Sequence, residues 1–213
     1  MRTTEKENRI LNMAKILIER DGVFSFKLSD LSRLSGVSRP TLYSHVRSKE
    51  DIFIRLYTRH LEFARNNLVT IINTDYLNNR EKLFAYYVGS SYFMSSKFDS
   101  IGMLTIARNQ SVENAASHES VMLMREQKRA LNSVVNQLWE GAQSDIEDSY
   151  MYLESIIATA NAVECGFKFS QAISLKDVFI SFALLFANIR WERQLICDNE
   201  KVEDYISNLY AWD

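Results

Sequence analysis

Apolar residues recur along most of this chain with the spacing of an α-helix. The first such stripe consists of Ile10, Ala14, Leu17 and Ile18. It predicts a helix over about residues 4–21. Gly22 follows directly and predicts the end of this helix, because glycine readily takes the left-handed conformation found at helix C-termini.

Two short helices joined by a tight turn are predicted next, between about residues 28 and 46. The apolar face of the first is expected at Leu28, Leu31 and Leu34. Gly36 predicts the bend between the two helices. Ser38 is a favourable N-cap for the second helix, and Pro40 falls where a missing backbone N–H costs nothing.

The second short helix has an outer face suited to a DNA groove. Leu42 and Val46 are four residues apart and are expected to face the core. The residues left on the outer face are polar or cationic: Arg39, Thr41, Ser44 and His45. A small helix with such a face fits the major groove of DNA, so the pattern predicts a helix-turn-helix.

The rest of the chain is predicted to be helical as well. Ser48 begins a long helix over about residues 49–73, with Glu50 and Asp51 in its first turn, where the helix dipole favours acidic side chains. After a loop, further helices are predicted over about residues 81–95, 100–109, 114–140, 147–168, 174–196 and 200–211. The pattern therefore predicts an all-α fold.

Composition narrows the class of protein. With 46% hydrophobic residues, one proline and six glycines, the chain is neither disordered nor proline-rich. Two cysteines are too few for a disulfide framework and no secretory signal opens the chain, which predicts reduced thiols and a cytoplasmic location. The most apolar run, residues 178–189, is shorter than the roughly 20 residues that a membrane-spanning helix needs. No membrane association is expected.

The net charge of −2 hides an uneven distribution. Residues 1–60 contain 12 Lys and Arg against 7 Asp and Glu, whereas residues 61–213 contain 13 against 20. A basic N-terminal segment on an acidic remainder fits a nucleic-acid surface at one end, since phosphate repels the acidic part. A segment of this length also reaches such an excess by chance, so the charge supports the helix-turn-helix prediction without carrying it alone.

Several short motifs in the first quarter of the chain resemble the TetR family of transcriptional regulators. They are Arg9-Ile10-Leu11, Gly22, Asp30-Leu31, Gly36-Val37-Ser38, Thr41-Leu42-Tyr43, His45 and Ser48-Lys49-Glu50. The sequence departs from the family pattern at Val23, Phe26, Lys27, Ser32, Ser35, Pro40 and Val46. The resemblance implies a DNA-binding head followed by an all-helical body.

The resemblance also implies how the head contacts DNA. Phosphate-contacting positions of the family correspond to Ser38, Tyr43, His45 and Lys49, and Lys27 is expected to strengthen this contact. Arg39, Thr41 and Ser44 are the candidates for reading base edges, with Arg39 suited to bind guanine through two hydrogen bonds. Pro40 has no N–H to donate and is expected to make only apolar contact.

One recognition helix covers few base pairs, so a homodimer on a palindromic operator of double-stranded DNA is expected. The predicted dimer surface lies on the two long helices near the C-terminus, at Leu153, Ile156, Ile157, Ala160, Phe179, Phe182 and Phe186. The alternative is that these apolar stripes form only the core of one subunit.

The middle of the chain is rich in aromatic residues and methionine, which favours a pocket for a small, mainly apolar or aromatic effector. The candidate pocket residues are Tyr87, Phe93, Met103, Arg108, Met124, Trp139 and Asn161. Ordinary core packing is the alternative for each of them.

Enzyme function is not expected, because the three histidines lie far apart and no phosphate-binding loop or nucleophile motif is present. No cofactor or metal is predicted. The sequence predicts a helix-turn-helix domain at residues 1–50, joined by a long helix to an effector-binding and dimerisation domain at residues 51–213. The preferred function is a repressor released by a small ligand. The alternative is an effector-independent DNA-binding protein or a helical interaction protein.

Overall fold

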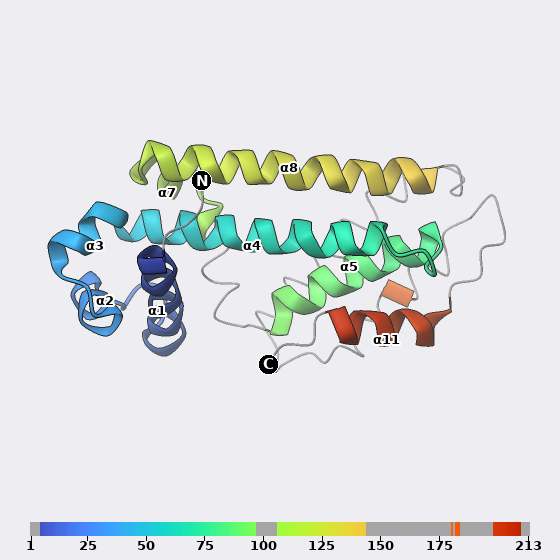
Figure 1. Cartoon of the computed structure of the whole chain (residues 1–213), viewed down its shortest axis with the longest axis horizontal. Helices are drawn as coiled ribbons and strands as arrows, with labels where there is room; N and C mark the ends of the chain where they lie inside the picture. The colour runs from blue at the N-terminus through green and yellow to red at the C-terminus, as the bar shows by residue number, and fades with distance from the viewer. Residues whose placement is uncertain (1–4, 97–105, 144–179, 181, 184–197, 210–213) are drawn as a thin grey trace. The chain divides into compact units, whose positions relative to one another are not determined.

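The computed structural model describes residues 5–96, 106–143, 180, 182, 183 and 198–209, apart from the side chains of residues 92–96 and 143. Over these residues the chain consists of helices and connecting turns (Figure 1). The helices are α1 (Glu5–Asp21), α2 (Leu28–Ser35), α3 (Arg39–His45), α4 (Lys49–Ile72), α5 (Asn79–Ser96), α7 (Gln110–Ala115), α8 (His118–Gln143) and α11 (Asn199–Leu209). The predicted all-α class is confirmed.

Most helices of the described part begin and end close to the predicted positions. The helix predicted over residues 114–140 is different, because α7 ends before Ala116 and α8 begins after Ser117. The Ser117 hydroxyl accepts a hydrogen bond from the backbone N–H of Ser120 at 3.4 Å, which starts a new helix at this point. The helices predicted over residues 147–168 and 174–196 lie outside the described residues, as does most of the helix predicted over residues 100–109.

The chain divides into two compact units. The first contains residues 1–63 and 99–130, and the second contains residues 64–98 and 131–213. The division therefore falls within the long helices α4 and α8. The predicted functional division between residues 50 and 51 stays a prediction.

The first unit is built around the helix-turn-helix. α1 packs against α2, and α2 against α3, beside the N-terminal end of α4 (Figure 1). The Phe26 ring is fully buried and packs edge-on against Phe53, with 5.9 Å between ring centroids. Other core side chains of this unit are Ile10, Leu11, Ala14, Leu17, Leu31, Leu42, Val46, Ile52 and Ile54. Burial of this apolar set positions α3 on the surface of the unit.

The buried face of α2 differs from the predicted one. Leu34 is 42% exposed, whereas Ser32 and Ser35 are buried. A helix turns by about 100° per residue, so a step of three residues drifts around the axis, and Leu34 leaves the face that Leu31 occupies. The two serine hydroxyls donate to the carbonyl oxygens of Val37 at 2.7 Å and of Leu31 at 2.6 Å. Their burial therefore leaves no unpaired hydroxyl.

In the second unit one buried carboxylate joins the starts of two helices. Glu81 is 1% exposed and lies in the first turn of α5. Its Oε2 accepts from the backbone N–H of Asn78, just before α5, and from Lys201 Nζ, both at 2.9 Å. Its Oε1 accepts from the backbone N–H of Asp198, just before α11, at 3.1 Å. Glu81 thus completes the caps of α5 and α11 at the same time.

We expect Glu81→Gln to lower the free energy of unfolding by about 2 kcal/mol, because the charge that pairs with Lys201 is lost in a buried setting. Amide hydrogen exchange should become faster over residues 199–209 before it changes over residues 5–21. Urea unfolding followed by exchange measurements on the folded protein checks both statements. Unchanged exchange in α11 would contradict this role of Glu81.

Candidate nucleic-acid interface

The recognition helix α3 begins with the predicted cap. Ser38 has an extended backbone, with φ −65° and ψ 154°, and its hydroxyl accepts from the backbone N–H of Thr41 at 3.3 Å. Pro40 lies in the first turn, where it removes no helical hydrogen bond. The turn before α3 is made by Gly36, whose φ of +63° favours glycine. These local features end α2 and start α3 within a few residues.

α3 separates an apolar inner face from an exposed outer face, as predicted. Leu42 is fully buried, and Val46 directly after the helix is fully buried as well. The side chains on the exposed face are Ser38, Arg39, Pro40, Tyr43 and Ser44, and Tyr43 is 49% exposed. Thr41 and His45 are half-buried at the edges of this face. The outer face therefore presents a cation, a phenol and hydroxyls to solvent.

The hydroxyls of the outer face are hydrogen-bonded within the helix. Ser44 Oγ donates to the carbonyl oxygen of Thr41 at 2.8 Å. The hydroxyls of Ser38 and Thr41 lie 2.9 Å apart. Each of these oxygens keeps acceptor capacity, and each can rotate to donate to another acceptor. Contact with DNA would thus exchange intrahelical hydrogen bonds for bonds to phosphate or bases.

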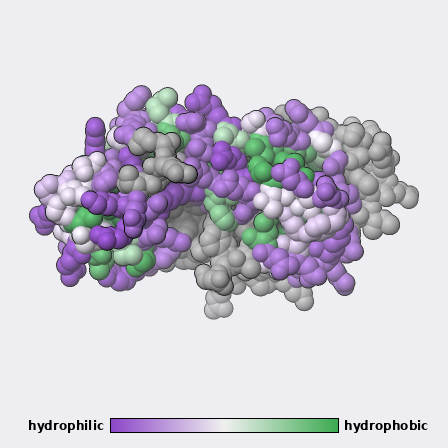
Figure 2. Space-filling model, viewed as in Figure 1, coloured by the Kyte–Doolittle hydropathy of each residue, from purple (hydrophilic) through white to green (hydrophobic). Residues whose placement is uncertain are grey.

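The two lysines predicted to contact phosphate differ in their surroundings. Lys27 is exposed and lies immediately before α2. Lys49 is half-buried, and its ammonium group donates to the carbonyl oxygen of Phe24 at 3.3 Å and lies 4.8 Å from the Phe26 ring centroid. Lys49 therefore ties the start of α4 to the turn between α1 and α2. The face of the molecule in Figure 2 is mainly hydrophilic with separate hydrophobic patches. Among the apolar side chains of the first unit, Phe24 is 86% exposed.

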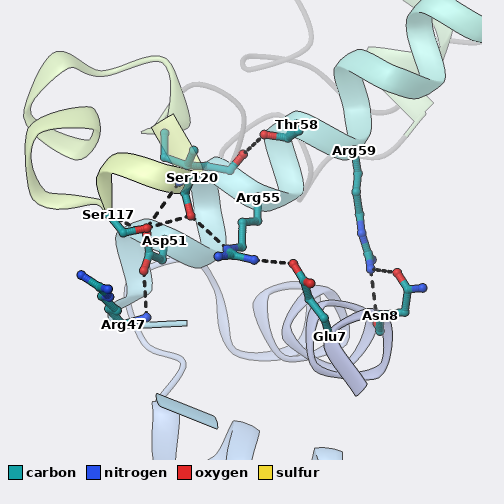
Figure 3. Close-up of polar contacts among 10 residues, drawn as sticks. Glu7, Asn8, Arg47, Asp51, Arg55, Thr58, Arg59, Ser117 and Ser120 are labelled. Carbon is teal, nitrogen blue, oxygen red and sulfur yellow. Dashed lines mark hydrogen bonds and ion pairs between the residues drawn. The ribbon is translucent and has the colours of Figure 1, made fainter. Parts of the chain in front are cut away.

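A polar cluster that sequence reasoning missed lies around the start of α4 (Figure 3). Asp51 is fully buried in the first turn of α4. Its Oδ2 accepts from the backbone N–H of Arg47 at 2.8 Å, and its Oδ1 accepts from the backbone N–H of Ser117 at 2.7 Å. Ser48 caps the same helix, with its hydroxyl accepting from the Asp51 N–H at 3.2 Å. One carboxylate therefore joins the start of α4 to the start of α8.

The cluster continues to α1. Arg55 Nε donates to the Ser120 hydroxyl at 2.9 Å, and Arg55 Nη1 forms an ion pair with Glu7 of α1. The side chains of this ion pair are 12% and 11% exposed, and Figure 3 shows Arg55 between Ser120 and Glu7. We use the name Asp51 cluster for Glu7, Asp51, Arg55, Ser117 and Ser120.

The Asp51 carboxylate stays ionised at neutral pH. Burial alone would raise its pKa, but hydrogen bonds from Ser117, Arg47 and Ser120 outweigh burial and hold the pKa below its usual value. The stabilisation that these bonds provide is present at neutral pH and is lost only as the pH falls below the ordinary aspartate range. The cluster is therefore a permanent feature of the protein near physiological pH.

Two of the predicted pocket residues meet in the second unit. Trp139 Nε1 donates to the Tyr87 hydroxyl at 3.0 Å, and the Phe182 ring stacks on Tyr87 with 6.4 Å between centroids. Burial raises the pKa of the Tyr87 phenol well above its usual value, and the Trp139 hydrogen bond opposes this only in part. Phe182, predicted at the dimer surface, is fully buried. These rings form a packed aromatic group with its polar atoms paired.

The structure does not place the other predicted pocket residues beside Tyr87 and Trp139. Arg108 and Met124 belong to the first unit, where Met124 is buried and Arg108 lies over the Tyr57 ring, 5.7 Å from its centroid. The remaining predicted pocket residues, Phe93, Met103 and Asn161, lie outside the residues whose side chains are described. The same holds for the predicted dimer residues Leu153, Ile156, Ile157, Ala160, Phe179 and Phe186.

A small polar cavity lies in the first unit, next to the Asp51 cluster. Its volume is about 100 Å³, and its lining residues are Glu7, Leu11, Arg55, Thr58, Arg59, Glu62, Leu123, Glu126 and Gln127. A water molecule occupies about 30 Å³, so this volume suits a few waters rather than a large apolar ligand. None of the predicted pocket residues lines it.

The described part of the chain contains neither a candidate membrane-spanning helix nor a candidate metal-binding group. No helix there is long and apolar enough to cross a membrane. No group of three or more His, Cys, Asp or Glu side chains is placed there to hold a metal ion.

Comparison with known proteins gives the family of the helix-turn-helix. The profile described as bacterial regulatory proteins, tetR family, matches residues 10–56, which extend from α1 into α4. The chain carries a TetR-family DNA-binding domain. Comparison with curated protein sequences gives no match.

Solved structures share the fold over most of the chain. A TetR family transcriptional regulator from Agrobacterium tumefaciens is 19% identical, with 89% of this chain and 100% of that chain covered and a TM-score of 0.61. FadR from Bacillus subtilis, solved with stearoyl-CoA, is 19% identical over 84% of this chain and 95% of that chain, with a TM-score of 0.60. The ketosteroid regulator KstR2 of Mycobacterium tuberculosis is 12% identical over 89% and 97%, with a TM-score of 0.61.

The helix-turn-helix is therefore a TetR-family domain, and the chain shares the all-helical fold of solved TetR-type structures. The matching family model describes bacterial regulatory proteins, which agrees with the function class predicted from the sequence.

Proposed function

We propose that this TetR family regulator is a one-component repressor that binds a palindromic operator as a homodimer and is released by a small, mainly apolar or aromatic ligand. Residues 1–50 serve as the DNA-binding domain, and residues 51–213 bind the effector and form the dimer.

One observation carries the DNA-binding part of the proposal. α3 buries Leu42 and exposes Arg39 and Tyr43 on its opposite face. Arg39 suits two hydrogen bonds to guanine, and the Tyr43 hydroxyl suits a phosphate oxygen. Residues Ser38, Pro40, Thr41, Ser44 and His45 complete the surface of α3, with Lys27 and Lys49 as cations outside the helix.

The dimer follows from the size of this helix. Seven residues of α3 cover only a few base pairs, so specific binding at cellular concentrations needs a second copy about one turn of DNA away. The apolar stripes near the C-terminus remain our candidates for the surface that joins the two copies. A monomer at micromolar concentration in analytical ultracentrifugation would contradict this part.

The effector is proposed from the aromatic group in the second unit. Tyr87, Trp139 and Phe182 form a packed apolar group in which Trp139 Nε1 donates to Tyr87 Oη, and an apolar ligand would bind by displacing part of this group. Two proteins of the same fold are also described with stearoyl-CoA and as a ketosteroid regulator, which supports a mainly apolar ligand class. A ligand that prefers a conformation with displaced recognition helices shifts the population away from the DNA-binding state.

A gel-shift experiment tests the proposal. The purified full-length protein is mixed with its own upstream intergenic DNA and excess nonspecific competitor at near-physiological salt. We expect a discrete complex that resists the competitor and that dissociates when an apolar aromatic compound from a screening set is added. A complex that forms only diffusely and disappears with moderate salt, on this DNA and on DNA selected from random sequence, would contradict sequence-specific regulation.

The alternative is a DNA-binding protein without an effector. A discrete complex that no compound of the set dissociates, together with no change in thermal stability by any of them, favours this alternative over the ligand-released repressor.

A further inference from the structure

Asp51 occupies the point where the recognition helix is attached to the rest of the protein. α3 ends at His45, and Arg47 lies between α3 and α4. By accepting from the Arg47 backbone N–H, the Asp51 carboxylate fixes the chain directly after the recognition helix. The Arg47 bond is 2.8 Å long and the acceptor is charged, so it restrains the backbone more strongly than a neutral pair would.

The other oxygen of the same carboxylate is bound to a distant part of the chain. Oδ1 accepts from the Ser117 backbone N–H at 2.7 Å, in the turn between α7 and α8. Ser117 also starts α8 through its hydroxyl. A shift of this turn relative to α4 therefore changes the hydrogen bonding of Asp51, and with it the restraint on Arg47.

Ser120 and Arg55 link the same turn to α1. Arg55 extends one helical turn beyond Asp51, between the Ser120 hydroxyl and the Glu7 carboxylate (Figure 3). Because the Arg55 and Glu7 side chains are nearly buried, removing one of them leaves the charge of the other unpaired and away from water. The start of α8 thus contacts the helix-turn-helix through α1 as well as through α4.

We propose that Asp51 is a positioning residue for operator binding, and that its bond to Ser117 is the contact through which the start of α8 sets the orientation of the recognition helix. With both oxygens bound, α3 is held in the orientation that fits the major groove. When the turn before α8 moves away, Arg47 loses its restraint and α3 loses that orientation. The proposal rests on the DNA-binding function and adds the site through which it is regulated.

The test compares Asp51→Asn with a matched variant, Glu81→Gln. Both replace a buried acid that accepts backbone hydrogen bonds at the starts of two helices, and both remove one negative charge. Only Asp51 adjoins the recognition helix. Ser120→Ala is a milder second variant that removes the hydroxyl bound by Arg55 and leaves the Asp51 carboxylate in place.

Operator and nonspecific affinities are measured by fluorescence anisotropy on full-length protein, at a temperature where circular dichroism shows every variant folded. Asp51→Asn is expected to weaken operator binding about tenfold, the size expected when one hydrogen bond to a charged group no longer favours the binding conformation. Its nonspecific affinity at low salt should stay within about twofold of wild type. Ser120→Ala should weaken operator binding by about threefold, and Glu81→Gln should leave it unchanged.

The direction of the change in operator affinity distinguishes a positioning role of Asp51 from a simple effect of its charge. Loss of a carboxylate strengthens attraction to phosphate, so charge alone would raise the affinity of both acid variants. Wild-type or higher operator affinity in folded Asp51→Asn overturns the proposal. An equal loss in Glu81→Gln also overturns it, because general destabilisation would then be the cause.

Hydrogen exchange without DNA distinguishes failure of this inference from failure of the proposed function. In Asp51→Asn, the amides of residues 46, 47 and 117 should exchange faster, while residues 199–209 stay as in wild type. If wild-type protein binds no specific DNA, the proposed function fails, and this measurement still decides whether Asp51 joins the two segments. Unchanged exchange at these amides overturns the inference.

Discussion

Arg39→Ala is expected to weaken operator binding by roughly 30-fold for each half-site, since one good side-chain contact to a base is worth about 2 kcal/mol, and by up to about a thousandfold for a dimer that makes the contact twice. Tyr43→Ala is expected to cause a comparable loss. The two variants should differ on nonspecific DNA: loss of a base contact relaxes sequence preference, whereas loss of a phosphate contact weakens binding to all sequences. Fluorescence anisotropy with operator and scrambled duplexes measures both.

Arg33→Ala is the matched control for these variants. It removes the same charge as Arg39→Ala from the neighbouring helix α2, where the Arg33 side chain is 74% exposed and pairs with Asp30 at 3.2 Å. The fold should persist in all three variants, because Arg33, Arg39 and Tyr43 are exposed. Wild-type affinity in both Arg39→Ala and Tyr43→Ala would show that α3 does not read the groove.

The helix-turn-helix could be predicted from the sequence because each of its parts depends on neighbouring residues. The Ser38 cap, the left-handed Gly36 and the pair of Leu42 and Val46 all act within one or two helical turns. The same is true of the start of α4, where the Ser48 cap followed by Glu50 and Asp51 predicts a helix N-terminus. Local rules therefore place α3 and expose its outer face.

Contacts between distant segments could not be predicted in this way. The sequence predicts Asp51 in the first turn of a helix, where an acidic side chain is favoured, but its bond to Ser117 spans 66 residues of sequence. The spacing of Leu34 predicts a core position, but only the packing of α1 against α2 shows which side of α2 is buried. The predicted pocket residues likewise fall into both units, because richness in aromatic residues does not specify which rings meet.

Asp51 and Glu81 each accept hydrogen bonds from backbone N–H groups at the starts of two helices. Each helix start has backbone N–H groups without partners inside the helix, and burial makes them costly to leave unpaired. A carboxylate in the first turn of one helix accepts from its own chain and from the start of a second helix. One carboxylate thereby holds two helix starts together. Such a restraint suits a protein whose proposed DNA binding depends on the orientation of the short helix α3.

The free energy of unfolding is expected to fall as the pH drops from about 7.5 to about 5, and His60 should account for about 2 kcal/mol of this loss. Burial, together with the charge of Arg108, lowers the pKa of His60 from 6.5 to about 4. The His60 ring is stacked on the Tyr57 ring with 6.3 Å between centroids. The Arg108 guanidinium also lies over the Tyr57 ring. The folded protein therefore keeps His60 neutral in this range, while the unfolded chain takes up a proton and is stabilised.

His60→Gln isolates this contribution, because glutamine keeps hydrogen-bonding capacity and does not titrate. Urea unfolding of both proteins at a series of pH values gives the difference directly. The two proteins can differ in stability at neutral pH, so their slopes against pH are compared. The free energy of unfolding of wild type should fall more steeply than that of the variant as the pH falls from 6.5 towards 4. Parallel curves over this range would mean that His60 is protonated in the fold, and that its contact with Tyr57 and Arg108 does not exclude the charge.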